Sequence, residues 1–185
     1  MRTKALTFSA MCIVLNVVVG SIMQVINIPL LFLDTFGTIM GAILLGPVYG
    51  AAIGGGTNLV LGIVLGPINF PFALVNIALG LFVGFISKRW KFNYITAILT
   101  GVGLAVLCPL IGTPISIAVS GGLSGSGADL LVGFLRQSGE SIFQAAFIGR
   151  ITSNIIDKPV SCILAVFLIS KLPKYYLNQL KKAVA

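Results

Sequence analysis

The sequence lacks histidine altogether, has three separated cysteines, and contains only four acidic residues among 185. Without histidine or a pair of cysteines, the usual ligands of a transition-metal site are missing. General acid–base catalysis needs carboxylates or histidine gathered in one place, whereas these acids are dispersed along the chain. The sequence also has no GxxxxGK[ST] motif and therefore no recognisable ATP site. We expect neither an enzyme nor a metal or other cofactor.

Charge of either sign is scarce. Only 9% of the residues are charged and 57% are hydrophobic, with a mean hydropathy of +1.09, whereas soluble domains carry about 25% charged residues. These values predict an integral membrane protein. The length fits one compact bundle, so residues 1–185 are expected to form a single transmembrane domain. The 22 glycines suit helices that pack closely in lipid.

The net charge of +8 raises the possibility of a nucleic-acid partner. However, the basic residues flank apolar runs, at residues 2–4, 88–91 and 171–182. This placement is typical of the signals that orient a protein in a membrane, where lysine and arginine concentrate on the cytoplasmic side. We therefore expect a lipid bilayer, and no nucleic acid, as the environment of this chain.

The apolar runs predict a bundle of six transmembrane helices and an all-α fold. The expected spans are residues 5–23, 35–45, 48–65, 72–87, 94–119 and 141–170. An amphipathic piece is expected at 128–137. Six spans place both termini and the basic loop 88–91 on one side, which is the cytoplasmic side. The loops 27–34, 66–71 and 120–137 then lie outside the cell, where they could close over a small pocket.

The last expected span carries an unusual polar stripe. Arg150, Asn154 and Asp157 fall at positions i, i+4 and i+7 and share one helix face, while Gln144 and Lys158 lie towards its edges. Ionisable groups at membrane depth are costly and persist where they face a cavity, the bundle interior or each other. Arg150 has two readings: an internal ion pair with Asp157 or another acid, or an anchor for a ligand carboxylate or phosphate. The neighbours Asp157 and Lys158 read as a structural charge pair before Pro159.

Four amide side chains accompany this stripe, and they are Asn58, Asn76, Gln144 and Asn154. Each of them could hydrogen-bond a neighbouring helix and so help the helices pack. However, amides both donate and accept hydrogen bonds, and four of them together suit a small polar organic solute. Phe70 and Phe72 are either interfacial aromatics or a cover for the pocket. Asp34 precedes a helix, so capping of the helix N-terminus is its simplest role.

Three local phrases resemble one family. They are residues 33–62, the phrase GGLSGSGADLL at 121–131, and NIIDKPVSCILAVFL at 154–168. Together with the predicted spans, they resemble the substrate-binding S-components of energy-coupling factor (ECF) vitamin transporters. The resemblance implies a bacterial plasma-membrane protein that binds one vitamin and works with a membrane coupling protein and two cytoplasmic ATPases. It also implies that the first outer loop, ending at Asp34 and Thr35, gates the pocket. Small residues of the first helix would contact the coupling protein, and the nearest match is Ala5 and Ser9.

The closest likeness is to the pantothenate-type S-component. Arg150 suits the single carboxylate of pantothenate, and the amides suit its hydroxyls and amide. Binders of flavin or thiamine would be expected to show more Trp or Tyr for ring stacking, whereas the single tryptophan, Trp90, lies in a cytoplasmic loop. The expected substrate-binding residues are Asn58, Phe70, Asn76, Gln144, Arg150 and Asn154. Alternatives are an S-component for hydroxymethylpyrimidine or pyridoxine, or a self-sufficient small secondary transporter or channel.

Overall fold

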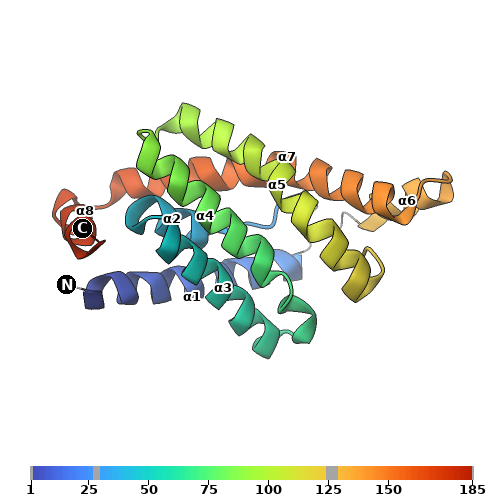
Figure 1. Cartoon of the computed structure of the whole chain (residues 1–185), viewed down its shortest axis with the longest axis horizontal. Helices are drawn as coiled ribbons and strands as arrows, with labels where there is room; N and C mark the ends of the chain where they lie inside the picture. The colour runs from blue at the N-terminus through green and yellow to red at the C-terminus, as the bar shows by residue number, and fades with distance from the viewer. Residues whose placement is uncertain (1, 27–29, 124–128, 185) are drawn as a thin grey trace.

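The computed structural model describes residues 2–26, 30–123 and 129–184 (Figure 1). Their helices are α1 (Arg2–Ile26), α2 (Phe36–Leu45), α3 (Pro47–Val64), the 3-10 turn η1 (Pro67–Asn69), α4 (Ala73–Arg89), α5 (Tyr94–Ser120), α6 (Asp129–Gln137), α7 (Ile142–Lys171) and α8 (Lys174–Val184). These residues contain no strand, which confirms the all-helical class. The helix limits agree with the expected spans to within a few residues.

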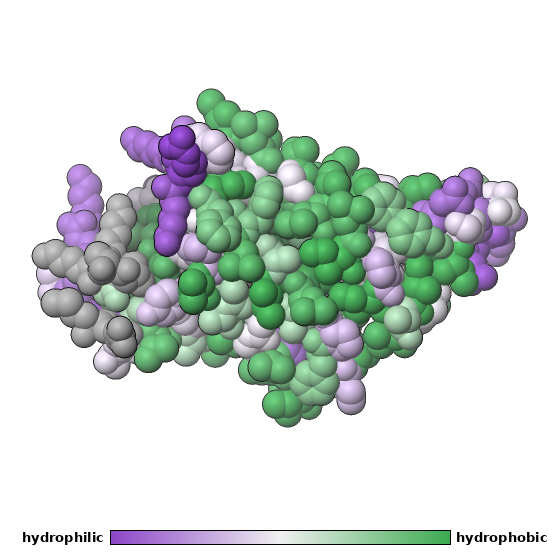
Figure 2. All heavy atoms as spheres, viewed as in Figure 1, coloured by the Kyte–Doolittle hydropathy of each residue, from purple (hydrophilic) through white to green (hydrophobic). Residues whose placement is uncertain are grey.

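Five of these helices are long and apolar enough to cross a membrane, rather than six. The expected second span is only the ten-residue helix α2, which is about 15 Å long against a hydrocarbon core of about 30 Å. Nearly every residue of α2 is buried in the protein, so it does not need to reach both surfaces. Figure 2 shows a broad hydrophobic surface across the middle of the molecule and hydrophilic patches towards both ends.

A tight turn joins α2 to α3. Gly46 has φ 90°, a conformation that favours glycine, and Pro47 lies in the first turn of α3, as the sequence predicts. Small residues then allow α3 to approach α4 very closely. At Gly80 an added Cβ would collide with the backbone of Gly50. Close approach of this kind is a common way for membrane helices to gain packing energy.

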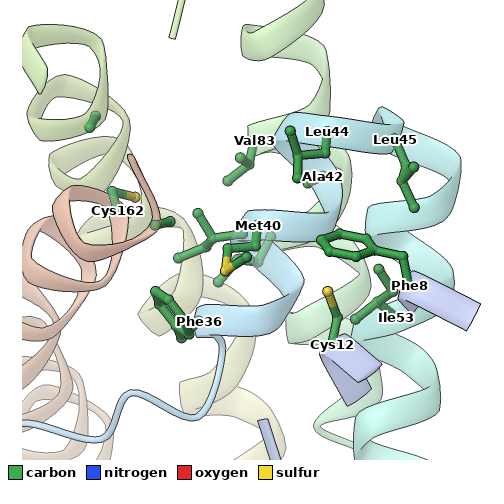
Figure 3. Close-up of a cluster of buried hydrophobic side chains, with 14 of the residues drawn as sticks. Phe8, Cys12, Phe36, Met40, Ala42, Leu44, Leu45, Ile53, Val83 and Cys162 are labelled. Atoms are coloured by element: carbon green, nitrogen blue, oxygen red, sulfur yellow. The ribbon is translucent and has the colours of Figure 1, made fainter. Parts of the chain in front are cut away.

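The core lies around α2, where α1, α3, α4 and α7 contribute apolar side chains. Figure 3 shows Phe8, Cys12, Met40, Ile53 and Val83 among the buried residues of this cluster. A buried polar junction lies next to it. Asn16 Nδ2 donates to the hydroxyls of Thr38 and Thr57 at 2.8 and 2.9 Å, and its Oδ1 accepts the Gly37 N–H at 2.5 Å. These bonds fix α1 against α2 and α3.

The C-terminal helix α8 is not among the elements expected from the sequence. It packs on α1, where Lys4 donates to Gln179 and the rings of Phe8 and Tyr176 meet edge to face. Both termini lie at the same end of the molecule (Figure 1). Helix α6 lies at the opposite end, and α1 ends between the two.

Candidate functional site

A cavity of about 450 Å³ lies in the half of the molecule away from the termini. Its walls come from the end of α1, the segment before α2, the connection between α3 and α4, and the facing sides of α5 and α7. The polar residues of its lining are Asp34, Thr35, Asn58, Asn69, Asn76, Ser120, Arg150, Ser153, Asn154 and Lys158. The volume falls within the range of small-molecule sites.

Arg150 projects from α7 into this cavity. Its Nε and Nη2 atoms are buried and have no hydrogen-bond partner among the residues that the structure describes. The guanidinium carbon lies 5.5 Å from the ring centre of Phe72, within the range of a cation–π contact. The carboxylate of Asp129 on α6 is close enough to act on Arg150 electrostatically. Buried donors without partners are unfavourable, so this guanidinium is suited to an acceptor that enters the cavity.

Three asparagines line the cavity near Arg150. Asn76 Nδ2 donates to Asn58 Oδ1, and Asn58 Nδ2 donates in turn to the carbonyl of Asn69 at 3.1 Å. Asn76 Oδ1 is buried without a partner in the described part of the chain. Asn154 Nδ2 donates to the Arg150 carbonyl at 2.8 Å, one helical turn away. The side chain of Asn58 thus also supports the loop after α3, whereas the bond described for Asn154 stays within its own helix.

Asp157 does not pair with Arg150 among the described contacts. Its Oδ2 accepts from Lys158 Nζ at 2.7 Å, which confirms the adjacent charge pair. Its Oδ1 accepts the backbone N–H groups of Phe32 and Leu33 at 2.8 and 2.9 Å. Both oxygens of the Asp157 carboxylate are therefore engaged by groups other than Arg150 in the described part of the chain.

Asp34 and Thr35 both approach the ammonium group of Lys158, which also pairs with Asp157. Lys158 Nζ donates to Thr35 Oγ1 at 3.1 Å and lies 3.5 Å from Asp34 Oδ1. Burial of its Oδ1 atom raises the pKa of the Asp34 carboxyl, and the ammonium of Lys158 opposes that shift. The expected capping role of Asp34 is wrong, because Thr35 occupies the N-cap position of α2 and makes no side-chain cap bond. We call the segment of residues 30–35, held on α7 by Asp157 and Lys158, the latched segment.

Two of the expected site residues lie outside the cavity lining. Gln144 is exposed and forms a capping box with Ser141 at the start of α7. The pattern Ser-x-x-Gln is a known signal for this motif and could have identified it. Phe70 packs over Gly62, and its neighbour Phe72 reaches the cavity instead.

Ala5 and Ser9, the expected contact residues for the coupling protein, are buried in the bundle instead of forming an exposed surface. Ala5 is 0% exposed and Ser9 is 9% exposed, and the Ser9 hydroxyl donates to the Ala5 carbonyl. Both residues face the bundle because they share the face of α1 that carries Phe8 and Cys12.

The family model for the ECF transporter substrate-specific component matches residues 4–169. No match was found among curated proteins or among solved structures. Substrate-specific components of ECF transporters are membrane subunits that work with a coupling protein and ATPases. Because the match extends over nearly the whole described chain, which is helical and rich in membrane-spanning segments, the protein belongs to the ECF transporter substrate-specific component family.

Proposed function

We propose that this protein binds one small, water-soluble, anionic vitamin in the cavity beside Arg150, with pantothenate as the best candidate. The observation that carries the proposal is the guanidinium of Arg150, a residue of the cavity lining, whose Nε and Nη2 are buried without partners among the described residues. Two adjacent donors of one guanidinium match a carboxylate, which accepts a bidentate pair of hydrogen bonds. The carboxylate of Asp129, which acts on Arg150 electrostatically, would then compete with the ligand carboxylate for the guanidinium.

The remaining lining suits the rest of such a ligand. Asn58, Asn76 and Asn154 offer amide donors and acceptors for hydroxyls and an amide. Phe72, with its neighbour Val75, supplies apolar surface for the branched carbon chain. Gln144 and Phe70 are left out of the proposed site because neither lines the cavity.

The position of the cavity supports uptake from outside. Its lining comes mainly from elements in the half of the molecule opposite the termini. The basic residues of both termini and of the α4–α5 connection favour a cytoplasmic location for the end that carries the termini. We propose a plasma-membrane importer in which the latched segment gates the cavity. The ligand is then delivered inward with the coupling protein and two ATPases. In this conformation α1 offers a coupling protein the exposed stripe Leu6, Ala10 and Val14, since Ala5 and Ser9 are buried.

Calorimetric titration of the purified full chain in detergent tests the ligand. Pantothenate is compared with panthenol, in which a hydroxymethyl group replaces the carboxylate, and with pyridoxine and hydroxymethylpyrimidine. We expect pantothenate to bind, and panthenol to bind about 30-fold more weakly or worse, because a buried charge-assisted contact contributes about 2–5 kcal/mol. No heat with pantothenate overturns the vitamin assignment, and equal binding of panthenol overturns the role of the charge.

The matched variants are Arg150→Gln and Arg136→Gln. Arg136 is exposed at the end of α6 and does not line the cavity. Only Arg150→Gln should lower pantothenate affinity, and it should leave panthenol affinity nearly unchanged. Loss of thermal stability without loss of pantothenate affinity would assign Arg150 a structural role instead.

A further inference from the structure

A second hollow lies between the end of α4 and the start of α5, and it shares no lining residue with the first cavity. It has a volume of about 470 Å³ and is lined by Ile86, Trp90, Lys91, Asn93, Thr96, Leu99 and Thr100. We call it the α4–α5 groove. Lys91 and Asn93 are exposed, whereas Thr100 is only 2% exposed. The groove thus leads from an exposed cationic edge, past apolar side chains, to a buried hydroxyl.

The groove lies where two candidate membrane spans end, at Arg89 and Tyr94. Leu99 in its lining and Ile95 beside it are 68% and 69% exposed, which in a bundle of this composition marks a lipid-facing surface. Trp90 is 60% exposed, and tryptophan concentrates at the level of lipid headgroups. The apolar part of the groove is therefore open to acyl chains and its polar edge to headgroups.

The residues at the outer edge of the groove carry positive charge and have no acidic neighbour in sequence. Lys88, Arg89 and Lys91 fall within four positions, and the sequence has no acidic residue between Asp34 and Asp129. The guanidinium of Arg89 lies 6.0 Å from the ring centre of Trp90. A cationic edge on an apolar groove is complementary to an amphiphile with an anionic head.

Thr100 provides an independent observation. Its Oγ1 is buried and has no hydrogen-bond partner within the described residues. The hydroxyl of Thr57, also in a helix, donates to the carbonyl four residues earlier, which is the usual way to satisfy such a group. A buried hydroxyl at the inner end of an open groove is instead suited to an acceptor supplied by a bound molecule.

We propose that the α4–α5 groove is a binding site for one anionic phospholipid. The headgroup phosphate contacts Lys91 and the Asn93 amide, an acyl chain lies along Ile86 and Leu99, and an ester oxygen accepts from Thr100. A free phosphate is disfavoured because it would leave the apolar walls uncovered. This site is separate from the proposed vitamin site and does not depend on it.

Trp90 is the only tryptophan, so the fluorescence of the unmodified chain reports on this groove. The full chain is reconstituted in vesicles of phosphatidylcholine with brominated acyl chains, which quench tryptophan on contact. This lipid is then replaced stepwise by unbrominated phosphatidylglycerol or, in parallel, by unbrominated phosphatidylcholine. We expect phosphatidylglycerol to restore fluorescence with an apparent affinity about fivefold higher than that of unbrominated phosphatidylcholine. One lysine near an anionic membrane surface contributes about 1 kcal/mol, which corresponds to this ratio. Equal recovery with the two lipids overturns the proposal.

Three variants test whether the lipid preference comes from the groove itself or from the general positive charge of the surface. Lys91→Gln should bring the two lipids towards parity. Thr100→Val removes a contact to an ester oxygen that both lipids carry, so it should weaken the binding of both and keep the ratio of their affinities. Lys174→Gln, which removes an exposed lysine of α8 outside the groove, should keep the preference. If Lys174→Gln lowers the preference as much as Lys91→Gln does, the groove is not a specific lipid site. If Thr100→Val abolishes the preference, the placement of the ester at Thr100 is wrong.

Discussion

The backbone N–H of Leu33 donates to the carboxylate of Asp157 at 2.9 Å, across 124 positions of sequence. Leu33 has φ 51° and Leu30 has φ 71°, so the latched segment contains two non-glycine residues in the left-handed region. Such conformations are costly and persist where surrounding contacts fix them. For Leu33, the buried carboxylate of Asp157 on α7 supplies such a contact beside the cavity.

The charge of Asp157 should therefore be important for stability. Asp157→Asn keeps an acceptor oxygen for the N–H groups of Phe32 and Leu33 but leaves Lys158 without its closest counter-charge. We expect the free energy of unfolding to fall by about 3–5 kcal/mol, because breaking a buried pair strands the other charge. Denaturant unfolding in detergent measures it.

The double variant Asp157→Asn/Lys158→Met is the internal control for this prediction. It removes both charges, so it should be more stable than the sum of the two single changes by about 1–3 kcal/mol. Glu140→Gln, at an exposed acid, should stay close to the unsubstituted protein. Strictly additive losses would mean that the two charges do not act as a pair.

Asp34 should affect ligand kinetics more than stability. Its side chain is 43% exposed and its distance to Lys158 is 3.5 Å, compared with 2.7 Å for the buried pair. Asp34→Asn is expected to cost less than about 1 kcal/mol of stability. If the latched segment gates the cavity, both binding and release of pantothenate should accelerate. Rapid filtration with labelled ligand measures the rates, and unchanged rates with this variant would count against gating by Asp34.

Two asparagines of the proposed site should behave differently. Asn154→Ala removes a cavity amide that bonds only within α7, so affinity should fall by about 1–3 kcal/mol with little loss of stability. Asn58→Ala also removes the bonds to Asn76 and to the Asn69 carbonyl. It should lower affinity and melting temperature together. Calorimetry and thermal unfolding on the same preparations separate the two effects, and a matched pattern for both variants would contradict the assignment.

The contact of α3 with α4 should not tolerate added volume. Gly80→Ala places a Cβ against the Gly50 backbone, which cannot move independently of its helix. We expect a loss of about 1–3 kcal/mol, read out by thermal unfolding. Gly133→Ala in α6 is the matched control, because its Cβ would meet nothing within 4 Å. That variant should be neutral or slightly more stable, since alanine favours helices. Equal melting temperatures for the two variants would show that α3 and α4 accommodate the added methyl group at position 80 without loss of stability.

The sequence alone determined the membrane class, the helix limits and the group of polar residues to consider. Apolar runs and helix-ending residues act over short distances, so the limits of α3 and α5 could be predicted closely. The stripe of Arg150 and Asn154 was visible because helical spacing places both on one face of α7.

The tertiary structure decided which of these residues share a space. Spacing could not show that Asp157 belongs to Lys158 and the latched segment rather than to Arg150, because those partners lie on a segment far away in sequence. It could not show that α2 is enclosed by the protein, or that α8 and the bundle bury the face of Ala5. Hydropathy reports how apolar a stretch is, whereas the enclosure of a side chain depends on which helices surround it.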